Sequence, residues 1–312
     1  KLLVGIAGCL VGFLIATPQV VKWPDKYLAG FLYELRHAGS GHGFIFMGRG
    51  PGWLDFMSSL GFGMGVFLLI LCLFAVALSI VRRSKADWIL LSFIIPYFLM
   101  VSLSEVRFTR YAIPILPVLV ILTARMIVEV TSILREHSSV VVKWGWILLC
   151  MSVMIYTMIY SAAFVKLFTP PDPRTEAAEW FFDNVPVKTT IGFATIPWFY
   201  SPPLAINMNG LPDKTSHDRD IPNRYDAMSE SRYKLIARPD VEWDASILTE
   251  DKPAYIIISD YEYEDPLRLK MKSAKEFFNK LECDYKKTRE FKKGLSAFGI
   301  CFGTNGILPH DL

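Results

Sequence analysis

Five long apolar runs in the first half of the sequence restrict the fold of this chain more than any other feature. Each run comes close to the roughly 17 to 25 residues that a helix needs to cross a hydrocarbon core of about 30 Å. The 312-residue chain has 52% hydrophobic and only 20% charged residues, which is too apolar for an ordinary soluble domain. We therefore expect a multi-pass protein of the inner (cytoplasmic) membrane, with helices over residues 2–19, 59–81, 87–103, 111–132 and 144–166.

The apolar runs stop near residue 170, after which the sequence has the composition of a water-soluble domain. Prolines 170, 171 and 173 mark the linker. The expected fold class is a polytopic α-helical membrane domain over residues 1–169, with a large loop at 20–58, followed by a small α/β domain over 170–312. Helices of that domain are predicted over 175–185 and 273–282, and strands over 189–194, 254–259 and 295–302.

Positive charge in the short loops predicts the orientation. Arg82, Arg83 and Lys85 follow the second apolar run, and Arg135 and Lys143 precede the fifth, as in loops that face the cytoplasm. The loop at 20–58, the short loop before the fourth run and the α/β domain are then extracytoplasmic. Further along the fourth run, Arg125 is expected to snorkel to the cytoplasmic headgroups. A net charge of only +3 argues against nucleic acid as a partner.

The loop at 20–58 predicts a helix that lies in the membrane interface. Pro24 and Asp25 are typical of its start and Gly39 of its end, with an apolar face between them. A glycine-rich stretch follows, but no strand precedes it, so we do not interpret it as a nucleotide-binding loop. His42 and Arg49 in this stretch either contact a substrate or are, respectively, a solvated histidine and an arginine that meets lipid phosphate.

Two arginines stand where the fourth apolar run begins. Arg107 and Arg110 are three residues apart and are followed directly by Tyr111. Guanidinium groups at a membrane boundary often anchor to lipid headgroups. Their planar forks can also clamp a phosphate or pyrophosphate, and a lipid-linked phosphate is the ligand that this depth favours. Both interpretations remain open from the residues alone.

The segment RFTRYAIPILPVLVILTARMI, with its Arg-Tyr-x-x-Pro-x-x-Pro core, resembles bacterial GT-C superfamily glycosyltransferases of the branch that contains dolichyl-phosphate-mannose protein mannosyltransferases and aminoarabinose transferases. Three other stretches are similar to this family: DPRTEAAEWFFDNVPVKTTIGF, KPAYIIISDYEYEDPLRL and GHGFIFMGRGPGWLDFMSSLGFGMGVFLLIL. The resemblance implies an enzyme that transfers a hexosyl or pentosyl group from a polyprenyl-phosphate donor to a glycan, lipid or protein acceptor on the extracytoplasmic side.

By the same resemblance, Arg107 and Arg110 correspond to positions that hold the lipid phosphate, with Tyr111 nearby. The family's catalytic carboxylate lies after the first membrane helix of the full protein, and we expect this chain to be the C-terminal part of such a protein. Glu105 and Asp55 do not match the family's acidic motif, so no catalytic base is assigned.

The sequence contains no motif for a nucleotide or redox cofactor. Some relatives in the resembled family use a divalent cation, and the five scattered histidines do not decide whether this chain needs one. The alternative from another class is a non-enzymatic membrane protein, such as a transporter subunit or an assembly factor with a sensor-like domain. Transporters tend to have broken or polar helices near the bilayer midplane, which the apolar runs do not predict.

Overall fold

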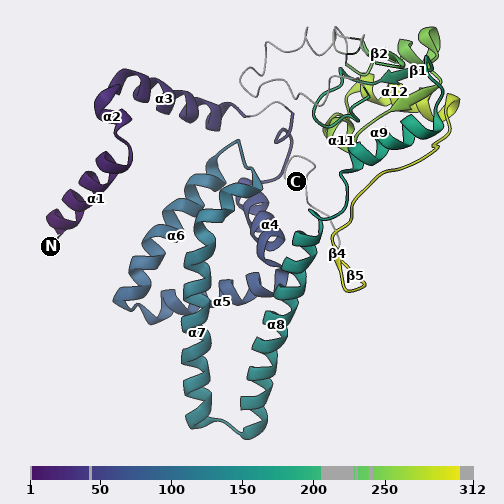
Figure 1. The fold of residues 1–312 in the computed structure, drawn as a ribbon. Coiled ribbons are helices and arrows are strands. Elements are labelled where there is room, and N and C mark those ends of the chain that lie inside the picture. Colours follow the sequence, from purple (N-terminus) through teal and green to yellow (C-terminus); the bar gives the residue numbers. More distant parts are fainter. Residues whose placement is uncertain (1, 42–43, 205–227, 229–230, 239–241, 303–312) are drawn as a thin grey trace.

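The computed structural model describes residues 2–41, 44–204, 228, 231–238 and 242–302. The described chain is mostly helical, with a bundle of apolar helices and a small α/β domain (Figure 1). A linker between α8 (Val140–Lys166) and α9 (Pro173–Asn184) joins the two parts. We call the end of the bundle nearest that linker the domain-facing end.

Three helical segments are long and apolar enough to cross a membrane, which confirms three of the five predicted spans. They are α6 (Lys85–Leu103), 3₁₀-helix η1 (Thr109–Ile115) with α7 (Leu116–His137), and α8 (Val140–Lys166). The 3₁₀ turn before α7 contains Pro114, and Pro117 follows in the first turn of α7. Proline has no N–H to donate and suits the first turn of a helix.

The predicted span over 59–81 is wrong as a single helix. Helices α4 (Gly52–Met64) and α5 (Val66–Arg82) meet at a bend of 119°, so that the pair forms either one broken span or a re-entrant loop. Gly65 makes the break with φ +82°, and a Cβ there would lie 2.9 Å from a ring carbon of Tyr156. The hydroxyl of Tyr160 donates to the Phe62 carbonyl over 2.7 Å and so satisfies a backbone group beside the break.

The predicted span over 2–19 stays a prediction. Helix α1 (Leu2–Ala16) covers most of this apolar run, and its 15 described residues extend about 22 Å, against a hydrocarbon core of about 30 Å. A helix is present where the sequence predicts an interfacial one: α3 (Pro24–Ser40), which follows the short α2 (Gln19–Lys22). Its place in the membrane interface stays a prediction. The helix ends at Gly41 rather than Gly39, because Gly41 takes φ +83°. Its apolar face is exposed in the isolated chain, at Leu28, Phe31, Leu32 and Leu35.

An ion cluster joins α5, α6 and α7 away from the domain-facing end. The fully buried carboxylate of Asp87 accepts from Arg82 and from Arg125, each over 2.6 Å. The Ser84 hydroxyl also donates to Asp87 over 2.6 Å. The prediction that Arg125 snorkels to headgroups is therefore wrong: its guanidinium compensates a buried carboxylate, which would be costly to leave unpaired.

The α/β domain is built on a three-stranded parallel sheet with strand order β2-β1-β3. Its strands are β1 (Thr190–Phe193), β2 (Lys234–Ile236) and β3 (Tyr255–Ile257). Ile191 and Phe193 pack with α9 (Pro173–Asn184) on one face. On the other face, Ile236 and Ile256 pack with the π-helical turn η2 (Ile247–Asp251) and α12 (Lys272–Asp284). Helix α11 (Asp260–Arg268) follows β3 directly. Cover on both faces is expected of a parallel sheet.

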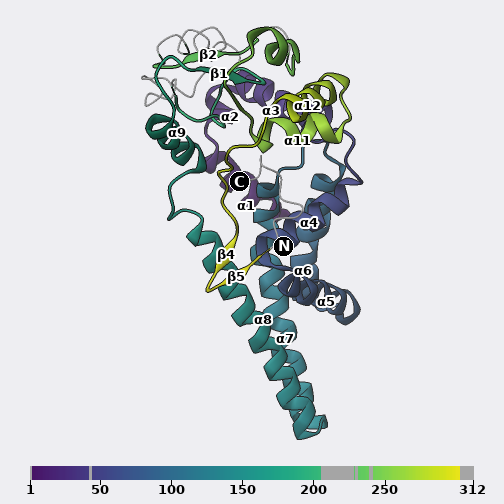
Figure 2. The same cartoon turned by 90° about the vertical axis from the view of Figure 1, so that its right-hand side faces the viewer.

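The third predicted strand of this domain lies elsewhere. Residues 295–302 form a hairpin of β4 (Ser296–Ala297) and β5 (Ile300–Cys301), which lies beside α8 (Figures 1 and 2). Leu295 and Ala297 pack on Tyr160 and Ala163 of α8. The predicted strand character is right, but its partners are a membrane helix and its own hairpin rather than the sheet.

Candidate functional site

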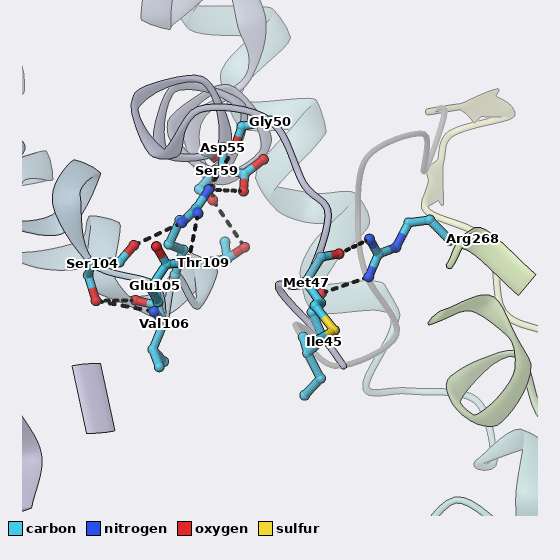
Figure 3. A network of polar contacts seen from close by, with 11 residues as sticks. Ile45, Met47, Gly50, Asp55, Ser59, Ser104, Glu105, Val106, Thr109 and Arg268 are labelled. Atoms are coloured by element: carbon cyan, nitrogen blue, oxygen red, sulfur yellow. Dashed lines mark hydrogen bonds and ion pairs between the residues drawn. The ribbon is translucent and has the colours of Figure 1, made fainter. Parts of the chain in front are cut away.

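Arg107 lies at the domain-facing end of the bundle, where α4 begins and α6 ends. Its Nη1 donates to the Gly50 carbonyl over 2.8 Å and to Asp55 Oδ2 over 3.0 Å. Its Nε donates to the Ser104 carbonyl over 2.9 Å, and Nη2 lies 3.5 Å from Glu105 Oε2. Figure 3 shows the residues that surround this guanidinium.

This network leaves little of the Arg107 guanidinium for a ligand. The group has five N–H donors in a fixed plane, and protein oxygens accept from Nε and from both protons of Nη1. Its side chain is only 10% exposed. A phosphate could meet only Nη2 without displacing partners that the fold already supplies, and the Glu105 carboxylate lies 3.5 Å from that atom. Arg107 therefore holds loop 104–106 to the first turn of α4.

The packing around Arg107 explains why α4 begins where it does. Gly52, the first residue of α4, lies so close to α6 that a Cβ there would be 2.1 Å from the Ser102 carbonyl oxygen. On the other side of the loop, Ala38 of α3 accepts hydrogen bonds from the Ser104 hydroxyl over 3.1 Å and the Glu105 N–H over 2.8 Å. Segments far apart in sequence thus meet at one end of the bundle.

Arg110 has different surroundings. Its side chain is exposed, and its guanidinium carbon lies 3.9 Å from the centroid of the Phe108 ring and 5.7 Å from that of Tyr111. Phe108 is buried and meets buried Phe46 edge to face, at a centroid distance of 5.0 Å. Within the described part of the chain, Arg110 has no carboxylate within ion-pair distance. A cation presented on an aromatic face keeps its N–H edges available for an anion.

Arg49 and Tyr111 contact the same group of aromatic rings as Arg110. Arg49 is partly buried, with its guanidinium 5.7 Å from the Phe46 centroid, so it belongs to the same aromatic cluster. Tyr111 packs edge to face on Phe108, and its carbonyl accepts from the Tyr97 hydroxyl of α6 over 2.7 Å. His42 lies outside the described residues. We call Phe46, Phe108 and Tyr111, with Arg49 and Arg110, the aromatic platform.

The nearby carboxylates both turn toward Arg107. Asp55 is 22% exposed and paired with it directly, whereas the side chain of Glu105 is 59% exposed and makes the longer contact. No group of three or more His, Cys, Asp or Glu side chains that could hold a metal ion occurs among the described residues. We assign no residue to a metal. Cys283 and Cys301 are free and exposed.

A second polar cluster lies in the α/β domain, at the carboxyl ends of β1 and β3. The Thr195 hydroxyl donates to Glu262, and the hydroxyls of Thr195 and Tyr200 are 3.1 Å apart. Glu262 also accepts from the Ser259 N–H over 3.0 Å, which completes a capping box at the start of α11. Loss of hydration on burial raises the pKa of Glu262 from 4.5 to about 7, against the opposing effect of these hydrogen bonds.

The sequence reasoning missed two parts of the site. One is the aromatic support: Arg110 stacks on Phe108, whose ring packs against Phe46. The other is α11 with Arg268, because the sequence analysis predicts a strand over 254–259 and no helix directly after it. A signal for α11 was present: Ser259 followed three residues later by Glu262 is the capping-box pattern of a helix start.

The chain matches no protein-family model, and searches of curated proteins and solved structures return no match.

Proposed function

We propose that this chain belongs to an integral-membrane glycosyltransferase that uses a polyprenyl-phosphate sugar donor, with Arg110 as the ligand of the donor phosphate. The observation that carries the proposal is the exposed guanidinium of Arg110 on the Phe108 ring, at the end of the bundle next to the α/β domain. The Arg-Tyr-x-x-Pro-x-x-Pro resemblance adds to it. Polyprenyl chains would lie among the apolar helices while their phosphate stays at the water interface.

Glycosyl transfer from a phosphate-linked donor requires positive charge beside the leaving phosphate. In glycosyl transfer from a polyprenyl phosphate, the bond between the anomeric carbon and the phosphate oxygen breaks, and the acceptor oxygen or nitrogen bonds to that carbon. The leaving phosphate gains negative charge, which a guanidinium stabilises through charge-assisted hydrogen bonds. Arg110 and Arg49 supply positive charge to one platform, whereas Arg107 holds loop 104–106 to the first turn of α4. The base that accepts the acceptor's proton stays unassigned.

The proposal places the platform and the α/β domain on the extracytoplasmic side. Its support is the positive charge of Arg82, Arg83 and Lys85, where α5 ends and α6 begins, away from the domain-facing end. In sealed cells, a membrane-impermeant maleimide should label native Cys283, which is exposed on α12, and not an introduced Lys85→Cys. All other cysteines would be replaced by serine. The reverse labelling pattern contradicts the proposed side.

The ligand class is tested by binding to the purified protein in detergent. Farnesyl phosphate, a short polyprenyl monophosphate, should bind saturably, while farnesol and inorganic phosphate should each bind at least about tenfold more weakly. Equal binding of farnesol would show that only the apolar chain is recognised. Equal binding of inorganic phosphate would show an anion site with no lipid preference. Either result contradicts the proposal.

The break at Gly65 favours a second candidate, a transport-type protein, because transporters place sites at discontinuous helices. Here Tyr156 and Tyr160 fill the bend, and the Tyr160 hydroxyl satisfies the Phe62 carbonyl. The described residues at the bend therefore have a packing role that accounts for the break. Farnesyl phosphate binding that depends on Arg110 would favour the transferase, and binding insensitive to Arg110 would favour the alternative.

A further inference from the structure

Arg268, at the last residue of α11, reaches from the α/β domain to a segment 221 residues earlier in the chain. Its guanidinium donates to the carbonyls of Phe44 over 3.0 Å, Ile45 over 3.2 Å and Met47. Figure 3 shows this side chain directed at Ile45 and Met47. One cation thus binds three main-chain carbonyls within four residues of the loop that precedes α4.

The Arg268 side chain is held in place on its own domain. The carboxylate of Asp265, only 6% exposed, accepts from Arg268 Nη2 over 2.8 Å and from Nε over 3.3 Å. A guanidinium braced in this way loses less side-chain freedom when it meets the carbonyls. Leu269 adds a packing contact, since a Cβ on Gly48 would lie 3.3 Å from its Cδ2. Gly48 also has φ +65°, which favours glycine at this contact.

The segment that Arg268 holds is the one that supports the aromatic platform. Phe46 lies between the carbonyls that Arg268 binds, and its buried ring packs against Phe108, on which Arg110 stacks. Three residues after Met47, the Gly50 carbonyl accepts from Arg107. The contacts therefore run from the α/β domain through residues 44–50 to both arginines.

We infer that Arg268 is a positioning residue: braced by Asp265, it docks the α/β domain on residues 44–50 and fixes the platform that presents Arg110. The effect on ligand binding rests on the proposed function, whereas the docking itself is measured separately by hydrogen exchange. If the ligand binds only when residues 44–50 are docked, the apparent affinity falls in proportion to the fraction of molecules in which this loop stays ordered.

The test compares Arg268→Ala with Arg238→Ala in the whole chain. Arg238 is a matched control, because it pairs with Glu250 and Asp251 on the same domain at a similar side-chain exposure, 35% against 31%. Hydrogen exchange of the Met47 and Arg49 amides, which bond to the Phe44 and Phe46 carbonyls, reports the order of the loop. Arg268→Ala should speed this exchange about tenfold and Arg238→Ala should leave it unchanged. Unchanged exchange in Arg268→Ala overturns the docking.

Farnesyl phosphate affinity then separates a positioning role from a merely structural one. If the ordered fraction of the loop falls to about a tenth, Arg268→Ala should weaken binding about tenfold, and Arg268→Lys should weaken it less. In an Arg110→Ala background, Arg268→Ala should weaken farnesyl phosphate binding no further, because Arg268 acts on the ligand only through Arg110. A full, additive loss in that background overturns the positioning role. If Arg110→Ala itself has no effect, the proposed function fails, while the exchange result still decides the docking.

Discussion

The guanidinium of Arg107 donates to the carboxylate of Asp55 over 3.0 Å, although the two residues lie 52 positions apart in the sequence. The pair ties the loop after α6 to the first turn of α4, and Gly50 and Ser104 carbonyls complete the coordination of the guanidinium. Its neighbour Arg110, three residues later, stacks on Phe108 instead. Two arginines that look equivalent in the sequence therefore have different physical roles.

Replacing Arg107 should destabilise the fold far more than replacing Arg110. Arg107→Ala leaves the partly buried Asp55 and two carbonyls without their donor, which should cost about 1 to 3 kcal/mol in free energy of unfolding. Arg110→Ala removes only exposed cation–π contacts and should cost less than about 1 kcal/mol. Unfolding by sodium dodecyl sulfate in mixed micelles measures both.

A double-mutant cycle provides the control for that prediction. Asp55→Ala should show a favourable coupling with Arg107→Ala and no coupling with Arg110→Ala, because only the first pair is in contact. Equal losses of stability in Arg107→Ala and Arg110→Ala would mean that the Arg107 network contributes nothing to the fold.

The close approach of α4 and α6 predicts an asymmetric response of two glycines in one helix. Gly52→Ala places a Cβ 2.1 Å from the Ser102 carbonyl, and the backbone must shift, which should cost at least about 1 to 3 kcal/mol. Gly63→Ala meets no atom within 4 Å and should be neutral or stabilise α4 by up to about 1 kcal/mol. The same unfolding assay compares them, and a Gly52→Ala protein as stable as the parent would contradict the observed helix contact.

Glu262 predicts a pH dependence of stability with a definite sign. Its pKa is raised from 4.5 to about 7, so that between these values the folded protein retains a proton that the unfolded chain has lost. The contribution of Glu262 to the free energy of unfolding should therefore be greatest below about pH 4.5. It should fall by at most about 3 kcal/mol as the pH rises toward 7.

Glu262→Gln isolates this effect, because glutamine cannot ionise. The difference in thermal midpoint between parent and variant, measured in detergent from pH 5 to pH 8, should shift in favour of the variant as pH rises. A difference that stays constant across this range would show that Glu262 titrates alike in the folded and unfolded states.

Length and hydropathy were enough to predict α6, α7 and α8, because a membrane core imposes both. They were not enough at Gly65, where the apolar run continues unbroken through the bend. That break depends on the φ angle of Gly65 and on the rings of Tyr156 and Tyr160, about a hundred residues later. Hydropathy depends neither on the φ angle of Gly65 nor on the packing of these rings.

Of the five residues that the sequence proposes for the site, Arg49, Arg107, Arg110 and Tyr111 lie at the domain-facing end of the bundle, and His42 lies outside the described residues. Their role in binding a ligand stays a prediction. The distinction between the two arginines depends on Asp55, Gly50 and Phe46, which reach them only through the packing of α4 and loop 44–50. Arg125 was misinterpreted for the same reason, since its partner Asp87 lies on another helix.

The most direct test of the account is the affinity of the purified chain for farnesyl phosphate in three variants of the arginine pair. Arg110→Ala should weaken binding by roughly tenfold to a hundredfold, the loss of a charge-assisted hydrogen bond of about 1.5 to 3 kcal/mol. Arg110→Lys should also lose affinity, because lysine keeps the charge but not the planar fork. The affinity of Arg107→Lys, corrected for the fraction of folded protein, should stay within about twofold of the parent. The control Arg232→Ala should do the same, because Arg232 stacks on Phe182 and Tyr233 of the α/β domain. Binding by Arg110→Ala within about twofold of the parent, or a selective loss in Arg107→Lys, would contradict the assignment of the phosphate to Arg110.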